Sequence, residues 1–489
     1  MSQDLLDRML GELHGCISPS VYESARLVSL APWLPGHEAR LQYLLDEQRP
    51  DGLWGGAGGY AVVPSLSAVE ALLTAMRDQS VGFDPVVRAA NRGLHAVASL
   101  LIHHPVSELP DTVAVELIVP ALVKEIELHV QRLRGDPVDG LDLVKLPTGL
   151  DDSALARIKR KLLAGMAPPQ TLLHTLEVLG EATASVVKFC APMDGIVCGS
   201  PAATAAWLRE RSSPGMRSRL EAVAANGPVP SAESISVFER SWSLAWLLAA
   251  GVPVAPPDDM VQGLEAALGP DGAPGGSGLP PDADDTAVVL HALALLGRPQ
   301  PLEVLRTFET PTHFACSVGE RTASPSVNSH VLEALGSTPT SEPWRTAAAS
   351  KVVAWLTETQ HADGCWEDKW HASPYYATAC CALALHRYGG RYSGPAVDRA
   401  VAWIRNTQQA VGGWGVWGPT TEETSYAVRL LATAENPTSD AVQRGTAFLR
   451  GYVGLPRPLL WHDKDLYAPH TIVDASIFAA EHLATTAGR

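Results

Sequence analysis

Positive charge is scarce in this sequence. Its 489 residues contain 37 Lys and Arg against 53 Asp and Glu, which gives a net charge of −16. A negative surface repels the phosphate backbone along any groove, so the charge balance argues against a nucleic-acid partner. An anionic substrate would have to be bound by a local basic cluster or by a divalent cation.

Targeting and membrane-spanning segments are also missing. The first residues, MSQDLLDRMLGELHG, contain acidic groups and no apolar core of the signal-peptide type, and no later stretch approaches the ~20 uninterrupted apolar residues of a membrane span. The seven cysteines are odd in number and lack C-x-x-C spacing, which argues against a disulfide framework or a zinc site. We therefore expect a soluble, cytoplasmic protein with no stable membrane insertion.

Alternating apolar segments of the β-strand type are rare, whereas apolar residues recur at helical spacing along nearly the whole chain. Examples are AVELIVPALVKEIELHV from Ala114, SWSLAWLLAAG from Ser241 and ATACCALALHRYGG from Ala377. The pattern predicts an all-α fold. At about 100–200 residues per domain, the length suits two or three domains.

Three segments resemble one another: EQRPDGLWGG at 47–56, TQHADGCWED at 359–368 and TQQAVGGWGV at 407–416. Each contains Gln, then a Gly turn, then Trp. Such self-similarity is typical of helical-hairpin repeats in which Gln caps a helix and Trp stacks over the connection. Repeated outer and inner helices can close into an α/α-barrel, and the Gly and Pro residues at 226–230 indicate a boundary between two such units.

The sequence Asp282-Ala283-Asp284-Asp285 places three carboxyl groups where a Gly- and Pro-rich loop enters an apolar helix. Three carboxylates this close repel one another, so the pKa of at least one is raised and that group keeps its proton near neutral pH. Because helix N-termini favour the charged form, we expect Asp282 and Asp285 to be ionised and Asp284 to hold the proton. A solvated helix cap is the other interpretation of such a sequence.

Together with the repeats, the D-x-D-D sequence resembles the class II terpene cyclases, which protonate a terminal alkene or epoxide and let the polyene fold into rings. Within that class the chain is similar to the bacterial diphosphate-retaining cyclases of the copalyl and tuberculosinyl diphosphate type. One departure is VYESAR at 21–26, where family members often read AYDTAW. The similar segments occur in order along the chain: ISPSVYESARLV, QRPDGLWGG, TVAVELIVPAL, TLLHTLEVLG, GSPAATAAWL, FERSWSLAWLL, SPSVNSHVLEALG, CWEDKWHASPYYATA, EETSYAVRLL and LWHDKDLY.

The resemblance implies two α/α-barrel domains, called β and γ in that family. It places residues 1–30 in the β domain as its N-terminal helix, residues 31–225 in an inserted γ domain, and residues 226–489 in the β domain that carries the acid. It also implies that Asp284 donates the proton, while Asp282 and Asp285 bond to it and polarise it.

An apolar cavity would hold the polyene coiled and stabilise the cation with aromatic faces. Buried aromatic residues serve mostly as core, so each candidate has that second interpretation. The candidates are Trp242, Trp246, Trp366, Trp370, Tyr375 and Tyr376.

Acid-initiated cyclisation leaves the phosphoester intact, so the diphosphate needs its own site. Lys464 in WHDKDLY and Lys369 in DKWHASPYY are the candidate phosphate ligands, with a surface charge as the alternative role. The resemblance implies Mg²⁺ with the diphosphate, and the partial acidic motif before ELIVP leaves Glu108, Asp111 and Glu116 as its candidate ligands.

Two polar residues in SVNSHV are further candidates. Asn328 and His330 are expected to bond to an aspartate or to receive the final proton, and a satisfied core residue is the other interpretation of such a His. The Asp-Asp pairs at 151–152 and 258–259 do not continue as D-D-x-x-D. Lacking that metal-binding sequence of ionising synthases, the chain should be monofunctional and release a cyclic diphosphate.

The leading interpretation is cyclisation of geranylgeranyl diphosphate to a bicyclic labdane- or clerodane-type diphosphate. Cyclisation of farnesyl diphosphate to drimenyl diphosphate is the alternative, because motifs do not measure cavity length. A squalene-hopene type enzyme is disfavoured by the small number of repeats and the negative charge. Two other classes are a non-catalytic α/α-barrel binding subunit and an α/α-barrel glycosidase. The oligomeric state, including a homodimer, is left open by the sequence.

Overall fold

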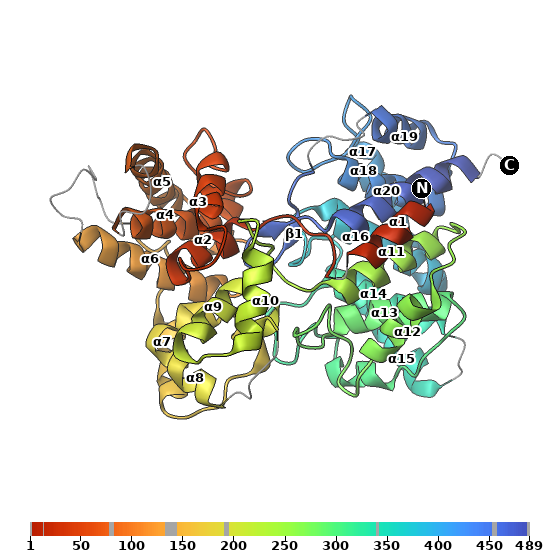
Figure 1. Cartoon of the computed structure of the whole chain (residues 1–489). Helices are drawn as coiled ribbons and strands as arrows, with labels where there is room; N and C mark the ends of the chain where they lie inside the picture. Colours follow the sequence, from red (N-terminus) through yellow and green to blue (C-terminus); the bar gives the residue numbers. More distant parts are fainter. Residues whose placement is uncertain are drawn as a thin grey trace. The chain divides into compact units, whose positions relative to one another are not determined.

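The computed structural model describes residues 2–12, 14–77, 83–132, 144–189, 195–338, 342–451 and 457–486. Over these residues the chain is almost entirely helical, as the apolar periodicity predicted (Figure 1). Its contacts define two compact units, each assembled from segments that are distant in the sequence. The first unit contains Met1–Cys16, Ser234–Trp461 and Ala468–Arg489, and the second contains Ile17–Glu233 and His462–Tyr467.

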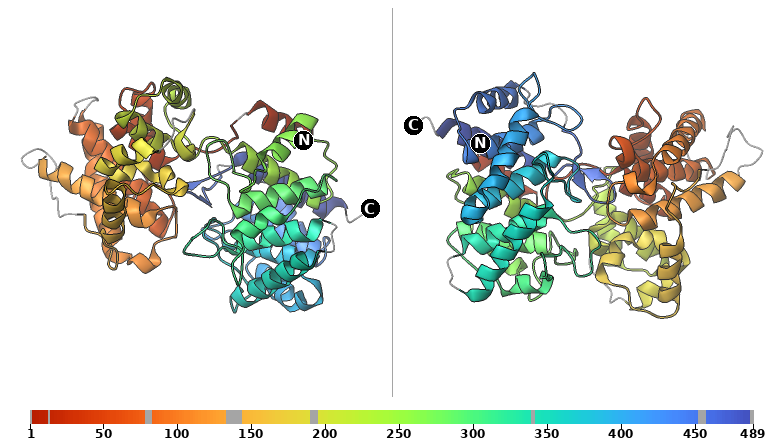
Figure 2. Two further views of the ribbon diagram at one scale, coloured as in Figure 1. Left: turned by 90° about the horizontal axis from the view of Figure 1, so that it is seen from below. Right: turned by 180° about the vertical axis from the view of Figure 1, so that it is seen from behind.

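The first unit is an α/α-barrel. Six of its helices, α11, α13, α14, α16, α18 and α20, contact one another in a closed ring, and α1, α12, α15, α17 and α19 pack outside them. Figures 1 and 2 show α1, at the N-terminus, among the green-to-blue helices of this unit, and it contacts α11 and α20. Its elements are α1 (Ser2–Gly11), α11 (Ser236–Ala249), α12 (Asp258–Ala267), α13 (Ala283–Leu295), η5 (Glu303–Phe308), α14 (Pro325–Ser337), α15 (Pro343–Thr359), α16 (Pro374–Tyr388), η6 (Gly390–Tyr392), α17 (Gly394–Asn406), α18 (Thr421–Ala434), α19 (Asp440–Gly451) and α20 (His470–Thr486).

The second unit is a smaller ring of the same kind. Its inner elements α2, α4, α6, η3 and α9 contact one another in a closed circuit, with α3, α5, α7 and α10 outside. The short strands β1 (Trp461–His462) and β2 (Leu466–Tyr467) pair with each other. The helical elements of this unit are α2 (Val21–Leu30), α3 (His37–Asp46), η1 (Gly58–Ala61), α4 (Val62–Arg77), α5 (Phe83–His103), η2 (Val106–Glu108), α6 (Val115–Arg132), α7 (Ser153–Leu163), η3 (Gln170–Ala182), α8 (Thr183–Phe189), η4 (Val197–Gly199), α9 (Pro201–Glu210) and α10 (Pro214–Ala224). The expected all-α fold with two α/α-barrels is confirmed.

The N-terminal boundary differs from the expected one. We expected residues 1–30 to join the C-terminal domain, but only residues up to Cys16 do so. Helix α2 contacts α3, α4 and α9, which all belong to the second unit. Its eight buried residues therefore contribute to that core. The other junction lies at Glu233, a few residues after the Gly- and Pro-rich sequence at 226–230.

Ser-Pro pairs begin three inner helices. Ser200, Ser324 and Ser373 are the N-caps of α9, α14 and α16, and each hydroxyl accepts a backbone N–H from the first turn. The Pro that follows each Ser has no N–H to leave unpaired and a backbone angle suited to the first helical position. These sequences therefore fix where the inner helices begin.

The three Gln–Gly–Trp segments form one repeated connection between an outer and an inner helix. Each Gln side chain donates to the carbonyl of its turn Gly and to a second carbonyl on the next outer helix, and each Trp indole donates to the preceding outer helix. The Gln pairs are Gln48 with Gly52 and Ala89, Gln360 with Gly364 and Ala396, and Gln408 with Gly412 and Ala441. The Trp pairs are Trp54 with Leu44, Trp366 with Leu356, and Trp414 with Ile404. The expected architectural role of both residue types is confirmed.

One helical stretch, Gly58–Arg77, is long and apolar enough to cross a membrane by length and composition alone. It comprises η1 and α4, and 89% of the apolar window is buried. Because α4 contacts α2, α5 and α6, its apolar residues belong to the core of the second unit.

Candidate active site

The three acids lie at the N-terminus of α13, an inner helix of the first unit. Asp282 is the N-cap, with extended backbone angles of φ −142° and ψ 172°, and its Oδ1 accepts a 2.8 Å hydrogen bond from the Asp285 N–H. Asp284 and Asp285 follow in the first turn. The three carboxyl groups are therefore held within one helical turn, as the sequence predicted.

The loop before α13 closes over Asp285. The Ala273 N–H donates to Thr286 Oγ1 at 2.8 Å, which ties the loop to the first turn of the helix. A Cβ at Gly275 would lie 2.7 Å from Asp285 Oδ2, so a glycine is needed for this close approach. Asp285 is left only 8% exposed, and water has little access to it.

Burial changes the protonation of the cluster. It raises the pKa of Asp282 to about 7, with a further contribution from the nearby charge of Asp284. Burial also raises the pKa of Asp285 well above its ordinary value, reinforced by Asp282 and Asp284. The expectation of a raised pKa is confirmed. Asp282 is therefore partly protonated near neutral pH and Asp285 favours its protonated form, contrary to the expectation that both stay ionised, because the cost of burying their charges exceeds the stabilisation offered by the helix N-terminus.

His330 completes the acid site. It lies on α14, and its Nδ1 is 2.6 Å from Asp284 Oδ1, with side-chain exposures of 2% and 15% respectively. Burial alone would lower the pKa of His330, but the Asp284 carboxylate raises it well above its usual value. The ring is then an imidazolium that donates to Asp284. A cation at this oxygen stabilises a carboxylate.

Asn328 precedes His330 by two residues on α14, and its side chain bonds to the backbone. Its Oδ1 accepts the Phe314 N–H at 2.8 Å, and its Nδ2 donates to the carbonyls of Phe314 and Ser324 at 2.9 Å each. The expected bond to an aspartate is therefore made by His330 and not by Asn328. The side-chain amide instead holds the loop at Phe314 against the start of α14.

Aromatic rings continue from the acid site. The Trp242 ring meets the His330 ring edge-on at 5.3 Å between centroids, and Phe238 lies 4.6 Å from Trp242. Phe238 in turn lies 5.5 Å from Trp461, which lies 4.9 Å from Tyr376. Trp242 and Phe238 come from α11 and Tyr376 from α16, which are both inner helices. These four side chains, Trp242, Phe238, Trp461 and Tyr376, are called the aromatic wall below.

The other expected aromatic candidates lie elsewhere. Trp366 is the Trp of a repeat and bonds to an outer helix. Tyr375 packs 4.8 Å from Trp403 on the outer helix α17. Trp246 contacts Tyr376 at 6.4 Å, and Arg429 lies over its ring at 4.4 Å. Trp242 and Tyr376 thus belong to the wall, Trp246 adjoins it, and Trp366 and Tyr375 pack between inner and outer helices.

Lys369 forms an ion pair with Glu320. Its ammonium also lies 5.1 Å from the centroid of the Trp370 ring. Glu320 Oε1 accepts the Cys316 N–H at 2.8 Å, and the Cys316 carbonyl accepts the Ala283 N–H at 2.9 Å, which connects this pair to the first turn of α13. Lys369 and Trp370 are thus linked to the loop beside the acids.

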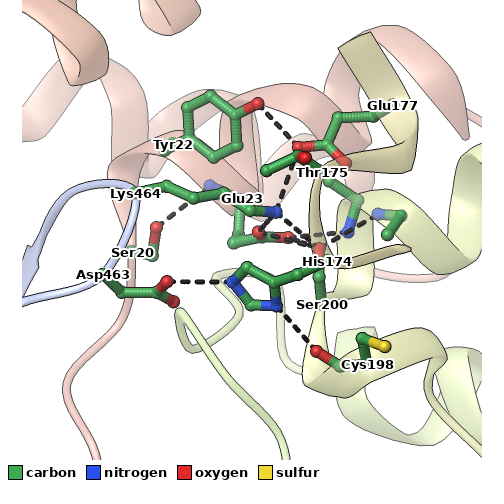
Figure 3. A network of polar contacts seen from close by, with 12 residues as sticks. Ser20, Tyr22, Glu23, His174, Thr175, Glu177, Cys198, Ser200, Asp463 and Lys464 are labelled. Atoms are coloured by element: carbon green, nitrogen blue, oxygen red, sulfur yellow. Dashed lines mark hydrogen bonds and ion pairs between the residues drawn. The ribbon is translucent and has the colours of Figure 1, made fainter. Parts of the chain in front are cut away.

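Lys464 lies in the second unit, in a buried network of charged groups (Figure 3). The ammonium donates to Glu23 Oε1 at 2.6 Å, Ser200 Oγ at 2.8 Å and Glu177 Oε1 at 3.0 Å. The hydroxyl of Tyr22 donates to the same Glu177 oxygen at 2.7 Å. All three ammonium donors are engaged, so a phosphate would have to displace one of these partners.

The same network extends to the residue before Lys464. Asp463 Oδ1 lies 2.9 Å from His174 Nε2, and Figure 3 shows this pair beside the lysine. Burial would lower the pKa of Lys464, but Glu177 and Glu23 raise it above its usual value. The lysine is therefore a permanent cation that compensates two buried carboxylates.

The expected magnesium ligands lie along the chain just before α6 and in its first turn. Glu108 ends η2, Asp111 lies in the next loop, and Glu116 is in the first turn of α6. The Val113 N–H in this loop donates to the Asp463 carbonyl at 3.1 Å, which brings the acidic segment to the lysine-bearing one. Oxygen ligands of this kind suit Mg²⁺, which needs only one or two carboxylates besides water and phosphate oxygens.

A compact three-residue cluster is found elsewhere in the part of the chain that the structure describes. It consists of His361, Asp363 and Cys365, whose ligand atoms lie within 4.8 Å of one another. They lie in the turn of a Gln–Gly–Trp repeat, where His361 and Asp363 are exposed, Cys365 is buried, and Asp363 Oδ1 accepts the Cys365 N–H. Glu108, Asp111 and Glu116 do not converge in this way.

Several residues of the site were missed in the sequence. Phe238 and Trp461 complete the aromatic wall, and a buried carboxylate, Glu422, lies beside it with His371 and Tyr426. The sequence signal for Glu422 was the pair of acids in TTEETSY at a helix start, which resembles the group of acids at Asp282–Asp285. It was ambiguous because such acids are also common in the first turn of a helix, where Glu423 here accepts a hydrogen bond from the hydroxyl of the N-cap Thr420.

A cluster of three carboxyl groups, two of them with a raised pKa, beside an aromatic wall in an α/α-barrel is the arrangement expected of a cyclase that begins its reaction with a proton. The comparisons with known proteins agree. Residues 320–455 match the family model of the squalene-hopene cyclase C-terminal domain. The ent-copalyl diphosphate synthase of Streptomyces sp. (strain KO-3988) is 42% identical over 97% of this chain and 94% of its own length.

Two further relatives support this assignment. The labda-7,13-dienyl diphosphate synthase of Streptomyces clavuligerus is 40% identical over 97% of this chain and 91% of its own. The solved structure of ent-copalyl diphosphate synthase from Streptomyces platensis has a TM-score of 0.91 at 40% identity, covering 99% and 98% of the two chains. The chain belongs to the family of bacterial class II diterpene cyclases that includes the copalyl diphosphate synthases, and it is an enzyme of the isomerase type.

Proposed function

We propose that this enzyme cyclises geranylgeranyl diphosphate to a bicyclic labdane- or clerodane-type diphosphate and retains the diphosphate. The observation that carries the proposal is the Asp284–His330 pair at the start of the aromatic wall. The relatives named as copalyl and labdadienyl diphosphate synthases support the C20 substrate, since those products have twenty carbons.

Asp284 is the proton donor in this proposal. The His330 imidazolium stabilises the carboxylate that forms when the O–H bond of Asp284 breaks. The proton adds to the terminal alkene carbon, and the electrons of the next two double bonds close two rings in turn. Trp242 presents its edge to His330 and adjoins the other rings of the wall, whose faces stabilise cationic carbon. The enclosed loop over Asp285 limits water, which would otherwise quench the cation.

The diphosphate needs a binding site of its own. We propose that Mg²⁺ accompanies it, that Glu108, Asp111 or Glu116 would supply one or two carboxylate ligands, and that Lys464 supplies positive charge near this segment. When bound, the ion neutralises phosphate charge. The hydrogen bond between Val113 and Asp463 supports this arrangement, because it joins the acidic segment to the lysine segment.

The test is incubation of the purified enzyme with Mg²⁺ and either geranylgeranyl or farnesyl diphosphate, followed by phosphatase treatment and mass spectrometry of the alcohols. We expect a bicyclic C20 alcohol. A cyclic C15 alcohol alone would assign the enzyme to farnesyl diphosphate, and only linear alcohols from both substrates would overturn the proposal.

Two variants make the experiment specific to the acid. Asp284→Asn should lose cyclisation by at least about 100-fold while keeping its fold, because a general acid supplies roughly 10²–10⁴-fold. Asp258→Asn is the matched control, since Asp258 is an exposed acid in the first turn of α12. We expect its product and rate to equal those of the unmodified enzyme.

A further inference from the structure

A second carboxylate is buried in the first unit, and its hydrogen bonds are unevenly distributed. Glu422 Oε1 accepts three of them, from Trp461 Nε1 at 2.8 Å, the Tyr426 hydroxyl at 2.9 Å and His371 Nε2 at 3.0 Å. Its Oε2 is also buried and makes no hydrogen bond to the part of the chain that the structure describes. Glu422 is 0% exposed, so a buried oxygen with free lone pairs is costly unless it serves a purpose.

The donors around Glu422 are neutral groups. The Ser373 N–H donates to His371 Nδ1 at 3.0 Å, so that nitrogen carries no proton and the ring donates from Nε2. Tyr426 and Trp461 donate from neutral groups as well. Three fixed donors on Oε1 orient the carboxylate and leave Oε2 as the oxygen that can accept a proton.

Glu422 adjoins the same aromatic wall as the acid. Trp461, which donates to Glu422, belongs to the wall, and Tyr376 stacks on the His371 ring at 4.5 Å with 15° between planes. The other end of the wall is Trp242, which contacts His330 of the acid site. The acid and Glu422 are thus placed at two ends of one set of rings.

We propose that Glu422 is the base that ends the cyclisation. The inference rests on the proposed function. After the second ring closes, Oε2 takes a proton from the carbon beside the cationic carbon, the C–H bond breaks, and its electron pair becomes the product's double bond. One proton enters from Asp284 and one leaves to Glu422, so the product is an isomer of the substrate. After the product leaves, exchange with solvent returns a proton to Asp284 and removes the proton from Glu422.

This assignment also accounts for the two polar residues expected to receive the final proton. His330 is bound to Asp284, and the Asn328 side chain is bound to three backbone groups. The protonated His330 ring has no lone pair to accept a proton, whereas Glu422 bonds to Trp461 of the wall through Oε1 and its Oε2 has no hydrogen-bond partner among the described residues.

The neighbouring acid provides a matched control. Glu423 lies in the same turn of α18 and is equally buried. Both of its oxygens are satisfied, Oε1 by Ser373 Oγ at 2.6 Å and the Val416 N–H at 2.8 Å, and Oε2 by Thr420 Oγ1 at 2.8 Å. Glu423 is therefore structural, and Glu423→Gln should lower stability while leaving the product unchanged.

The experiment compares the unmodified enzyme with Glu422→Gln and Glu423→Gln on geranylgeranyl diphosphate, with product identity as the readout. Glu422→Gln keeps an acceptor for the three donors but removes the base. We expect substrate to be consumed, with the normal product formed about 100-fold more slowly and a product heavier by one water, or an isomeric alkene, in its place. A purely structural role would not change which product forms.

The outcomes separate the two proposals. If the unmodified enzyme forms no cyclic diphosphate, the proposed function fails. If it does, and folded Glu422→Gln forms the same product at a similar rate, the base assignment is overturned. Should Glu422→Gln not fold, Tyr426→Phe removes one donor and keeps the ring. We expect a mixture of normal and water-quenched products from that variant, and the normal product alone would overturn the assignment.

Discussion

The acid of this enzyme depends on three carboxyl groups and one imidazole that perturb one another within a single turn of α13 and its neighbour α14. Burial raises the pKa of Asp282 and Asp285, and the His330 imidazolium donates to Asp284, the proposed proton donor. In the proposed reaction this cation stabilises the carboxylate that forms when Asp284 gives its proton to an alkene, which is a very weak base.

The role of His330 can be tested by replacing it with Gln. The amide can still bond to Asp284 but carries no charge, so the carboxylate left by proton transfer is less stable. We expect kcat to fall about 100-fold with little change in KM, because the aromatic wall that surrounds the polyene remains. Steady-state kinetics measure both quantities, and a rise in KM at constant kcat would contradict this role.

Asp282 should also determine how stability depends on pH. Its pKa is about 7 in the folded protein against 3.8 ordinarily, so the folded state keeps a proton that the unfolded state loses. This group therefore lowers the free energy of unfolding as pH rises from about 4 to about 7, with no further change above. Asp282→Asn preserves the N-cap and removes the charge. At pH 8 the variant should be more stable than the parent by about 4 kcal/mol, and at pH 4 nearly equal to it.

Urea denaturation at the two pH values measures this difference. Asp258→Asn serves as the control, since Asp258 is an exposed acid at the start of another helix. An Asp282→Asn variant whose stability relative to the parent is the same at pH 4 and pH 8 would show that the carboxyl group is not perturbed.

The sequence predicted where the three aspartates lie but not which of them keep their protons. Crowding in Asp282–Asp285 predicted a raised pKa, but which groups keep protons depends on burial, which is decided by the loop at Gly275 and by His330 across the barrel. Glu422 could not be distinguished from Glu423 in sequence, because the difference lies in which hydrogen-bond donors surround each carboxylate.

The Gln–Gly–Trp connection between an outer and an inner helix occurs at all three places that the sequence repeats predicted. The turn glycines have positive φ, for example 107° at Gly364, and the backbone of the next outer helix lies directly above them. A Cβ at Gly364 would lie 2.5 Å from the Arg399 carbonyl oxygen. Glycine is thus required here both for the backbone angle and for the close approach.

Two Gly→Ala variants separate these requirements. Gly297 follows α13 with φ 74°, and nothing lies within 4 Å of its added Cβ. Gly297→Ala should therefore cost only the backbone strain, about 1 kcal/mol, whereas Gly364→Ala should cost about 3 kcal/mol or more. Thermal or urea unfolding measures both values. Equal losses would show that the outer helix moves away without cost.

The repeats and the Ser-Pro helix starts were predictable because they depend on local geometry. Ser373 and Pro374, for example, define the start of α16 by capping and a fixed backbone angle. Which helices form the inner ring was not predictable from periodicity, since α18 and the outer helix α17 both carry apolar residues at helical spacing. The distinction depends on burial over the whole helix surface.

For the molecule as a whole, the chain passes between its two barrels several times, and each barrel is completed by a distant segment. The first begins with residues 1–16 and resumes at Ser234, and the second includes the six residues His462–Tyr467. The resemblance led us to expect two barrels but misplaced α2, because its partners α4 and α9 lie far along the chain. Contacts of this range leave no periodic signal in a single sequence.

The segment His462–Tyr467 should be indispensable to the second barrel. Lys464 compensates the buried carboxylates of Glu23 and Glu177. Removing one partner of a buried pair costs about 3–5 kcal/mol, since it leaves an uncompensated charge.

We therefore expect Lys464→Met in the full chain to lower the free energy of unfolding by about that amount, and Glu177→Gln added to Lys464→Met to restore part of the loss. A fragment of residues 17–233, which lacks Lys464 altogether, should unfold without a cooperative transition. Circular dichroism during thermal and urea unfolding tests all three proteins. A cooperative transition in the fragment would show that the core of α2, α4, α6 and α9 is stable without the lysine, and the cation would then be free to serve the diphosphate instead of the fold.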